Sequence, residues 1–155
     1  MAEAIAASRF GLLADKKILI AGVANHRSIA WAVAQVCAAH GALVGLTYQN
    51  DAFLKRVSRL ADEINARLMG KLDVTQHAEI DRLGQRLQDE WGRVDGIVHA
   101  IAYADKEALS GRYIDTTPAQ FEDALRISCF SLTALVKALG PLMPPNAGSI
   151  VTLTS

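Results

Sequence analysis

KKILIAGVANHRSIAWAVA, residues 16–34, joins an apolar run to a helical pattern through a short polar loop. Residues 18–21 carry no charge, which is typical of a central strand buried on both faces, and Gly22 follows where that strand would end. Apolar residues recur at helical spacing from Ile29 onward, so a helix is predicted to begin near Ser28. The free amides and the positive dipole end of this helix face the loop, which predicts an anion site there.

The loop departs from the glycine-rich fingerprint of dinucleotide-binding folds. Ala24, Asn25 and Arg27 stand where that fingerprint would have glycines. Gly22 remains and lets a diphosphate approach the backbone, and the Ser28 hydroxyl can add a hydrogen bond to it. Valine at position 22 would then block the ligand while the strand itself tolerates it. An ordinary strand-to-helix turn with a serine cap would give the same pattern, so both interpretations stay open here.

Four further strand-like runs alternate with helical patterns. The runs are 42–48, 66–72, 96–100 and 149–153, and the helical patterns cover about 51–65, 76–91 and 118–140. This alternation predicts an α/β fold: a Rossmann-like doubly wound parallel sheet in three αβα layers, with strand order 3-2-1-4-5, truncated after the fifth strand. We expect residues 1–155 to form a single dinucleotide-binding domain that is incomplete at its C-terminus. Ligands would meet the carboxyl ends of the strands, where Gly22, Gln49, Asp73 and Ile101 converge.

The last helical pattern carries its own start signal. Thr117, Pro118 and Gln120 offer an N-cap, a proline at the first helical position and the partner that completes a capping box. Thr75 could cap the preceding helix in a similar way. The segment 121–139 is apolar on nearly every face, so we expect it to be buried against the sheet and against a partner subunit.

Composition limits the classes of function. The 155 residues are 51% hydrophobic, and 16 basic residues balance 16 acidic ones without clustering, so we expect neither a nucleic-acid surface nor an anionic membrane as partner. The N-terminal stretch 1–17 lacks the pattern of a signal peptide or a membrane span, which predicts a cytoplasmic protein. Cys37 and Cys129 are predicted to be buried free thiols, and no spacing among histidines and cysteines predicts a metal site.

The end of the second strand predicts the type of cofactor. Gln49 can hydrogen-bond a ribose hydroxyl but offers no charge to a 2′-phosphate, so NADH is favoured over NADPH. Asn50 next to it is expected to cap the following helix. Asp73 and Val74, just past the third strand, could meet the adenine edge, although Asp73 could equally be a turn residue.

Several motifs together resemble the short-chain dehydrogenase/reductases, and within them the divergent bacterial NADH-dependent enoyl-[acyl-carrier-protein] reductases. The resemblance runs from about Leu12 to Ser155, with HAIAY at 99–103 where the family more often has HSIGF. Its marks are GVANHRSIA at 22–30, TYQND at 47–51, Asp73-Val74, DGIVHAIAY at 95–103 and GSIVTLT at 148–154.

The resemblance implies a binding role for eight positions. The pyrophosphate region of NADH would lie at Gly22, Ser28 and Ile29, the adenosine at Gln49, the adenine at Asp73 and Val74, the nicotinamide side at Ile101, and the enoyl substrate at Ala104.

The resemblance also implies the reaction and the assembly. In the family, hydride passes from NADH to the β-carbon of a trans-2-enoyl thioester on acyl carrier protein, in fatty acid biosynthesis, and the enzyme is a homotetramer. A tyrosine stabilises the enolate oxygen, and a lysine at the spacing Tyr-x6-Lys holds the nicotinamide ribose. Both fall beyond Ser155, and the family's upstream active-site tyrosine would align at or next to Ser155. We therefore expect no catalytic residue in this chain, and no activity from it alone.

Two alternatives to an enoyl reductase stay open. We expect Tyr48, Tyr103 and Tyr113 to have no lysine at the required helical spacing, so none of them would replace the expected catalytic pair. The chain could be a dinucleotide-binding fragment without catalysis. It could also belong to another short-chain dehydrogenase/reductase whose chemistry lies in a further segment.

Overall fold

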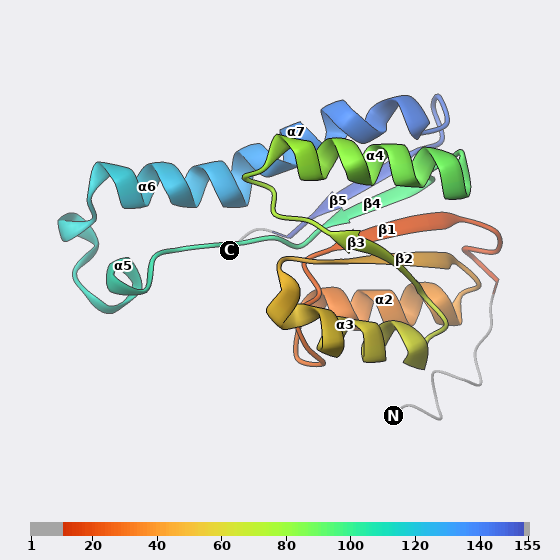
Figure 1. Cartoon of the computed structure of the whole chain (residues 1–155), viewed down its shortest axis with the longest axis horizontal. Coiled ribbons are helices and arrows are strands. Elements are labelled where there is room, and N and C mark those ends of the chain that lie inside the picture. Colours follow the sequence, from red (N-terminus) through yellow and green to blue (C-terminus); the bar gives the residue numbers. More distant parts are fainter. Residues whose placement is uncertain (1–10, 154–155) are drawn as a thin grey trace.

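The computed structural model describes residues 11–153 (Figure 1). Five parallel strands form one sheet in the order β3-β2-β1-β4-β5. The strands are β1 (Lys17–Ala21), β2 (Leu43–Tyr48), β3 (Arg67–Lys71), β4 (Gly96–His99) and β5 (Ser149–Thr152). The helices are α2 (Ile29–Ala39), α3 (Asp51–Glu63), α4 (His77–Trp91), α5 (Lys106–Ser110), α6 (Pro118–Leu125) and α7 (Ser131–Leu139), with a π-helical turn η2 (Arg126–Phe130) and the 3-10 turns η1 (Tyr113–Asp115) and η3 (Gly140–Leu142). The predicted doubly wound sheet and its strand order are confirmed.

Alternate residues of the central strand point to the two faces of the sheet. Ile20 packs into the core beneath α2 and α3, whereas Leu19 packs into the core beneath α4 and α7 (Figure 1). Both side chains are fully buried, and burial of each stabilises the fold by roughly 1.5–3 kcal/mol. The three αβα layers therefore follow from an apolar strand that is covered on both sides.

Burial is uneven along the last helical segment. Leu135 and Leu139 on α7 are fully buried, but α6 has no buried residue, and Leu125 and Phe130 are 50% and 54% exposed. The expectation that the whole of 121–139 is buried against the sheet is therefore wrong for its first half. The reason is geometric: α6 extends beyond the carboxyl edge of the sheet and reaches no strand (Figure 1).

The same segment stands out in hydropathy. Within the described residues, Pro118–Leu142 is the one helical run long and apolar enough to cross a membrane by length and composition, with 25 residues and a mean hydropathy of 1.3. Core helices of soluble proteins meet the same criterion. The burial of Leu135 and Leu139 against the sheet shows that part of this run serves as such a core helix.

Helix starts agree with the sequence in two places and differ in two. Thr117 and Gln120 form the predicted capping box, and Asn50 accepts a hydrogen bond from the Ala52 amide. Ser28 is the N-cap of α2 but makes no side-chain cap hydrogen bond. The N-cap of α4 is Gln76, so the prediction that Thr75 caps this helix is wrong.

Residues 1–10 of the N-terminal stretch, and residues 154 and 155 at the other end, lie outside the described residues.

Candidate functional site

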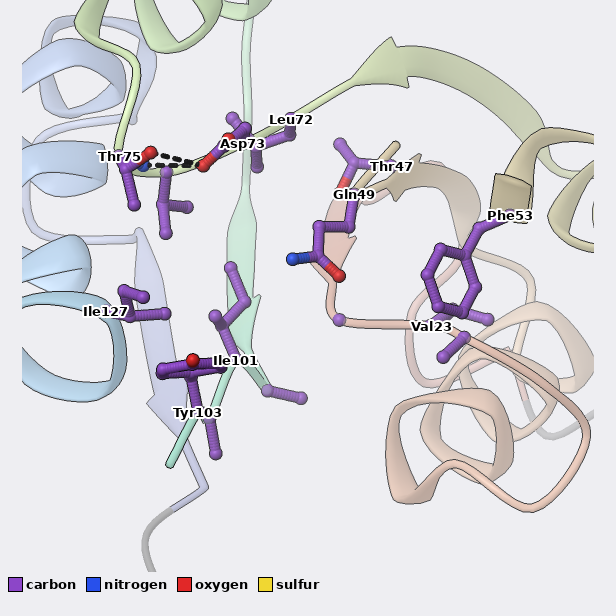
Figure 2. A pocket seen from close by; sticks show the side chains of 15 residues that line it. Val23, Thr47, Gln49, Phe53, Leu72, Asp73, Thr75, Ile101, Tyr103 and Ile127 are labelled. Carbon is purple, nitrogen blue, oxygen red and sulfur yellow. Dashed lines mark hydrogen bonds between the residues drawn. The ribbon is translucent and has the colours of Figure 1, made fainter. Parts of the chain in front are cut away.

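A cavity of about 340 Å³ opens where β1, β2, β3 and β4 end (Figure 2). Its volume falls in the range of small-ligand sites. Five residues that the sequence singled out line it, and they are Gly22, Gln49, Asp73, Val74 and Ile101. Ser28, Ile29 and Ala104 do not line it. The structure thus brings the predicted strand-end residues together at one cavity.

The backbone makes a very close approach at Gly22. Its φ is +112°, and a Cβ atom built there would lie 2.0 Å from the carbonyl oxygen of Ala100. The position must therefore be glycine for the loops after β1 and β4 to meet, before any ligand is considered. The prediction that the strand tolerates valine at position 22 is wrong for this reason.

Ser28 holds the loop that follows Gly22. Its Oγ accepts hydrogen bonds from the amides of Ala24 and Asn25, both at 3.1 Å. Among the described residues, the amides of Ile29 and Ala30 in the first turn of α2 have no partner. The loop is therefore folded by a side chain, and the helix keeps free donors at its N-terminus, as anion sites require. The Ile29 side chain itself is 67% exposed.

The second strand supplies the polar group nearest the middle of the cavity. Gln49 reaches into the cavity from the end of β2, with Val23 and Phe53 on the same side (Figure 2). The Arg56 guanidinium lies 5.8 Å from the centre of the Phe53 ring, and the Arg56 side chain is exposed. Among the described residues, those that line the cavity include no cation.

Asp73 forms a tight turn after β3. Its Oδ1 accepts hydrogen bonds from the Thr75 amide at 2.9 Å and the Thr75 hydroxyl at 2.7 Å (Figure 2). The Asp73 amide donates to Glu79 Oε2 at 2.6 Å, and Glu79 also contacts Lys71 at 3.5 Å. The turn role of Asp73 is thus present, and its peptide is held in place from the first turn of α4.

The wall opposite Gln49 comes from the segment after β4. Ile101 and Tyr103 line the cavity together with Ile127, which lies on the π-helical turn η2 (Figure 2). Sequence analysis did not select Ile127, because this residue reaches the cavity through the course of its helix past the edge of the sheet. Thr75 and Tyr103 also line the cavity, and the strand-end rule that selected Asp73 and Ile101 could have found them.

A buried histidine supports this wall from inside the fold. His99, the last residue of β4, is fully buried, with Nε2 at 2.7 Å from Ser131 Oγ and Nδ1 at 3.1 Å from Thr152 Oγ1. Ser131 donates its own proton to the Ile127 carbonyl, so it accepts from Nε2–H, and Nδ1 accepts from Thr152. The imidazole is neutral in this arrangement, and burial lowers the pKa of His99.

Other reactive groups lie apart from the cavity. Cys37 is half-buried and burial raises the pKa of its thiol, whereas Cys129 is exposed, so the prediction of a buried thiol is wrong there. Residues 11–153 contain no group of three or more His, Cys, Asp or Glu side chains that could hold a metal ion. Tyr48 and Lys55 do have the spacing Tyr-x6-Lys, so the expectation that no tyrosine has a lysine at this spacing is wrong for Tyr48. The two residues do not share one helix, because Tyr48 ends β2 and Lys55 lies on α3.

Comparison with known proteins gives consistent matches. The sequence profile of the family described as "Enoyl-(Acyl carrier protein) reductase" matches residues 22–155. The enoyl-[acyl-carrier-protein] reductase [NADH] of Rickettsia felis is 46% identical over 144 residues, which are 93% of this chain and 55% of that protein. A Rhizobium meliloti protein of the same description is also 46% identical, over 93% of this chain and 53% of its own length.

Solved structures agree with the sequence matches. The enoyl-[acyl-carrier-protein] reductase (NADH) of Aquifex aeolicus superposes with a TM-score of 0.89 at 43% identity, covering 92% of this chain and 57% of that one. The Anaplasma phagocytophilum reductase, in complex with NAD, superposes with a TM-score of 0.87 at 42% identity, covering 92% and 54%. The chain thus spans about half the length of the relatives it matches.

Proposed function

The chain belongs to the enoyl-(acyl carrier protein) reductase family, and we propose on this basis that it binds NADH for the reduction of an enoyl thioester. The observation that carries the proposal is the convergence of Gly22, Gln49, Asp73 and Ile101 on one cavity at the carboxyl ends of the strands. Dinucleotides bind at this edge in doubly wound sheets. Relatives of the same description are named as NADH enzymes, and one was solved with NAD.

Gln49 and the turn after β3 are proposed to hold the adenosine part. Gln49 would hydrogen-bond the ribose hydroxyls through its side-chain amide, and Asp73 and Val74 would border the adenine. One observation favours NADH over NADPH. Among the described residues, those that line the cavity include no cation to meet a 2′-phosphate.

The start of α2 is proposed to hold the pyrophosphate. The backbone amides of Ile29 and Ala30, which have no partner among the described residues, would donate hydrogen bonds to it. Ile29 would thus bind through its backbone, while its side chain faces solvent. Ser28 would act by folding the loop and by donating its hydroxyl hydrogen, because its oxygen already accepts from Ala24 and Asn25. Gly22 would let the diphosphate approach the backbone.

Ile101 and Ala104 are proposed to serve the reacting end. Bound NADH supplies the hydride for the β-carbon of the enoyl thioester. Ile101 would hold one face of the nicotinamide, and Ala104, which follows the cavity lining, would contact the enoyl group. We assign no catalytic residue within residues 1–155, since the family's tyrosine and lysine correspond to positions after Ser155.

Titration of tryptophan or NADH fluorescence tests the cofactor. We expect tighter binding of NADH than of NADPH, and Gln49→Arg should shift the ratio toward NADPH by about tenfold through a charge-assisted hydrogen bond. Gln88→Arg, which adds the same charge on the exposed side of α4, serves as the control and should leave the ratio unchanged. Tighter binding of NADPH by the unaltered chain would contradict the proposal.

Turnover is tested by the fall in NADH absorbance with a crotonyl thioester. We expect residues 1–155 to bind NADH without oxidising it, and a chain that continues through the family's Tyr-x6-Lys helix to oxidise it. Turnover by residues 1–155 would overturn the assignment of the chemistry to later residues. If the longer chain does not oxidise NADH, the result would favour the alternative, a dinucleotide-binding module without reductase activity.

The proposed substrate and assembly follow the same family. Enoyl-acyl carrier protein would be the partner, in fatty acid biosynthesis in the cytoplasm, and the enzyme would be a homotetramer. The half-exposed side chains of Leu125 and Phe130 support a subunit contact, because large apolar groups gather where helices meet a partner. Sedimentation of the full chain would test the assembly, and a monomer at micromolar concentration would contradict it.

A further inference from the structure

The segment after β4 leaves the sheet with few polar contacts of its own. Within the described residues, the backbone groups of Ile101, Ala102 and Ala104 make no hydrogen bond. Tyr103 is the exception: its amide donates to Ser128 Oγ at 2.9 Å, and its carbonyl accepts from the same hydroxyl at 3.1 Å. A single side chain from the neighbouring helix thus satisfies both backbone groups of one residue in the cavity wall.

The helix is adapted to make this contact. Ser128 lies in the π-helical turn η2, where the Ser131 amide donates to the Arg126 carbonyl five residues back instead of four. The Ser131 hydroxyl donates to the Ile127 carbonyl at 2.6 Å and accepts from His99. Turns of this kind inside α-helices occur frequently at functional sites.

Two hydroxyls on this helix therefore hold the segment at both ends. Ser131 binds the His99 side chain where the segment begins, and Ser128 binds the Tyr103 backbone where it leaves the cavity. Ile101 lies between the two contacts and lines the cavity, and Ile127, which directly precedes Ser128, lines the same wall (Figure 2). The segment from Ile101 to Tyr103 is thus held from both ends although it belongs to no helix or strand.

We propose that Ser128 is a positioning residue that holds the Ile101–Tyr103 wall in the shape that receives the nicotinamide end of the cofactor. The inference rests on the proposed function and adds to it a residue that touches no cavity surface itself. Ser128 acts through the Tyr103 backbone. It should therefore affect the nicotinamide half of the ligand and leave the adenosine half, at Gln49 and Asp73, unaffected.

The test compares two ligands on the full chain. Ser128→Ala should weaken NADH binding about fivefold, the loss that corresponds to one net hydrogen bond, while the affinity for ADP-ribose, which lacks the nicotinamide, stays unchanged. Ser128→Thr keeps the hydroxyl and should restore NADH binding. Cys129→Ala alters an exposed neighbour in the same turn and is the matched control.

The outcomes separate this inference from the function beneath it. If Ser128→Ala lowers the affinities for NADH and ADP-ribose equally, or leaves the affinity for NADH unchanged, the positioning role is overturned. NADH binding by the wild type would still support the proposed function in either case. A wild type that binds neither ligand overturns both. Hydrogen exchange adds a measurement that needs no variant: the Tyr103 amide should be protected in the wild type, and rapid exchange there would contradict the Ser128 contact.

Discussion

The two walls of the cavity are built differently. On the wall toward Val23 and Phe53, α3 buries Val57, Leu60 and Ala61 against strands that are themselves covered on both faces. Next to the opposite wall, α6 buries no residue, and all four residues of the edge strand β5 are exposed. Local stability follows buried contacts, so we expect the elements around the second wall to open at a lower free energy than those around the first.

The largest effect should come from the point where the two walls meet. Gly22→Ala places a Cβ atom 2.0 Å from the Ala100 carbonyl oxygen, and backbone on both sides must move. We expect a loss of more than about 4 kcal/mol in the free energy of unfolding, or no folded protein at all. Gly140→Ala adds the same methyl group into open space and is the control. Urea denaturation followed by circular dichroism measures both, and equal stabilities would show that the walls can separate at little cost.

A pair of leucines compares the buried and exposed parts of the helical run next to the second wall. Leu135→Ala should lower the free energy of unfolding by about 2–5 kcal/mol, because this side chain is fully buried in the core that α4, α7 and the sheet share. Leu125→Ala, at 50% exposure, should cost less than about 1 kcal/mol in the monomer. The same denaturation experiment reports both, and a large loss from Leu125→Ala would reveal a cover on α6.

The smallest effect is a dependence on pH that enters through His99. Burial lowers the pKa of His99 in the folded state below its ordinary value of about 6.5, so the unfolded state binds more protons as the pH falls through that value. Stability should therefore be complete above about pH 6.5 and decrease below it. His99→Gln should reduce this decrease between pH 6.5 and 5. An identical pH profile in the variant and the wild type would mean that His99 is not held neutral.

The first wall could be predicted from sequence because its signals are local. Apolar runs of strand length, the Asn50 cap and the polar residues after β2 and β3 are read from short stretches of sequence, and the strand-end rule then selects Gln49 and Asp73. The strand order followed from alternation and handedness alone.

The second wall could not be predicted to the same depth because its contacts are distant in sequence. Ile127 lines the cavity and Ser128 binds Tyr103 across 25 positions from a π-helical turn, for which the helical pattern of 118–140 gave no signal. The apolar faces of the same pattern predicted burial, yet Leu125 lies past the sheet edge. Periodicity reports which residues prefer burial and does not report where a helix runs relative to the sheet.

The close approach at Gly22 also constrains how this loop can evolve. Every substitution of glycine introduces a Cβ atom, so each single-base change that replaces Gly22 meets the Ala100 carbonyl at once. His26 and Arg27 are exposed, and the loop around them is folded by Ser28, so these positions can drift without touching the sheet. Gly22 is therefore required by the fold itself, before any requirement of cofactor binding, although the loop lacks the other glycines of the common fingerprint.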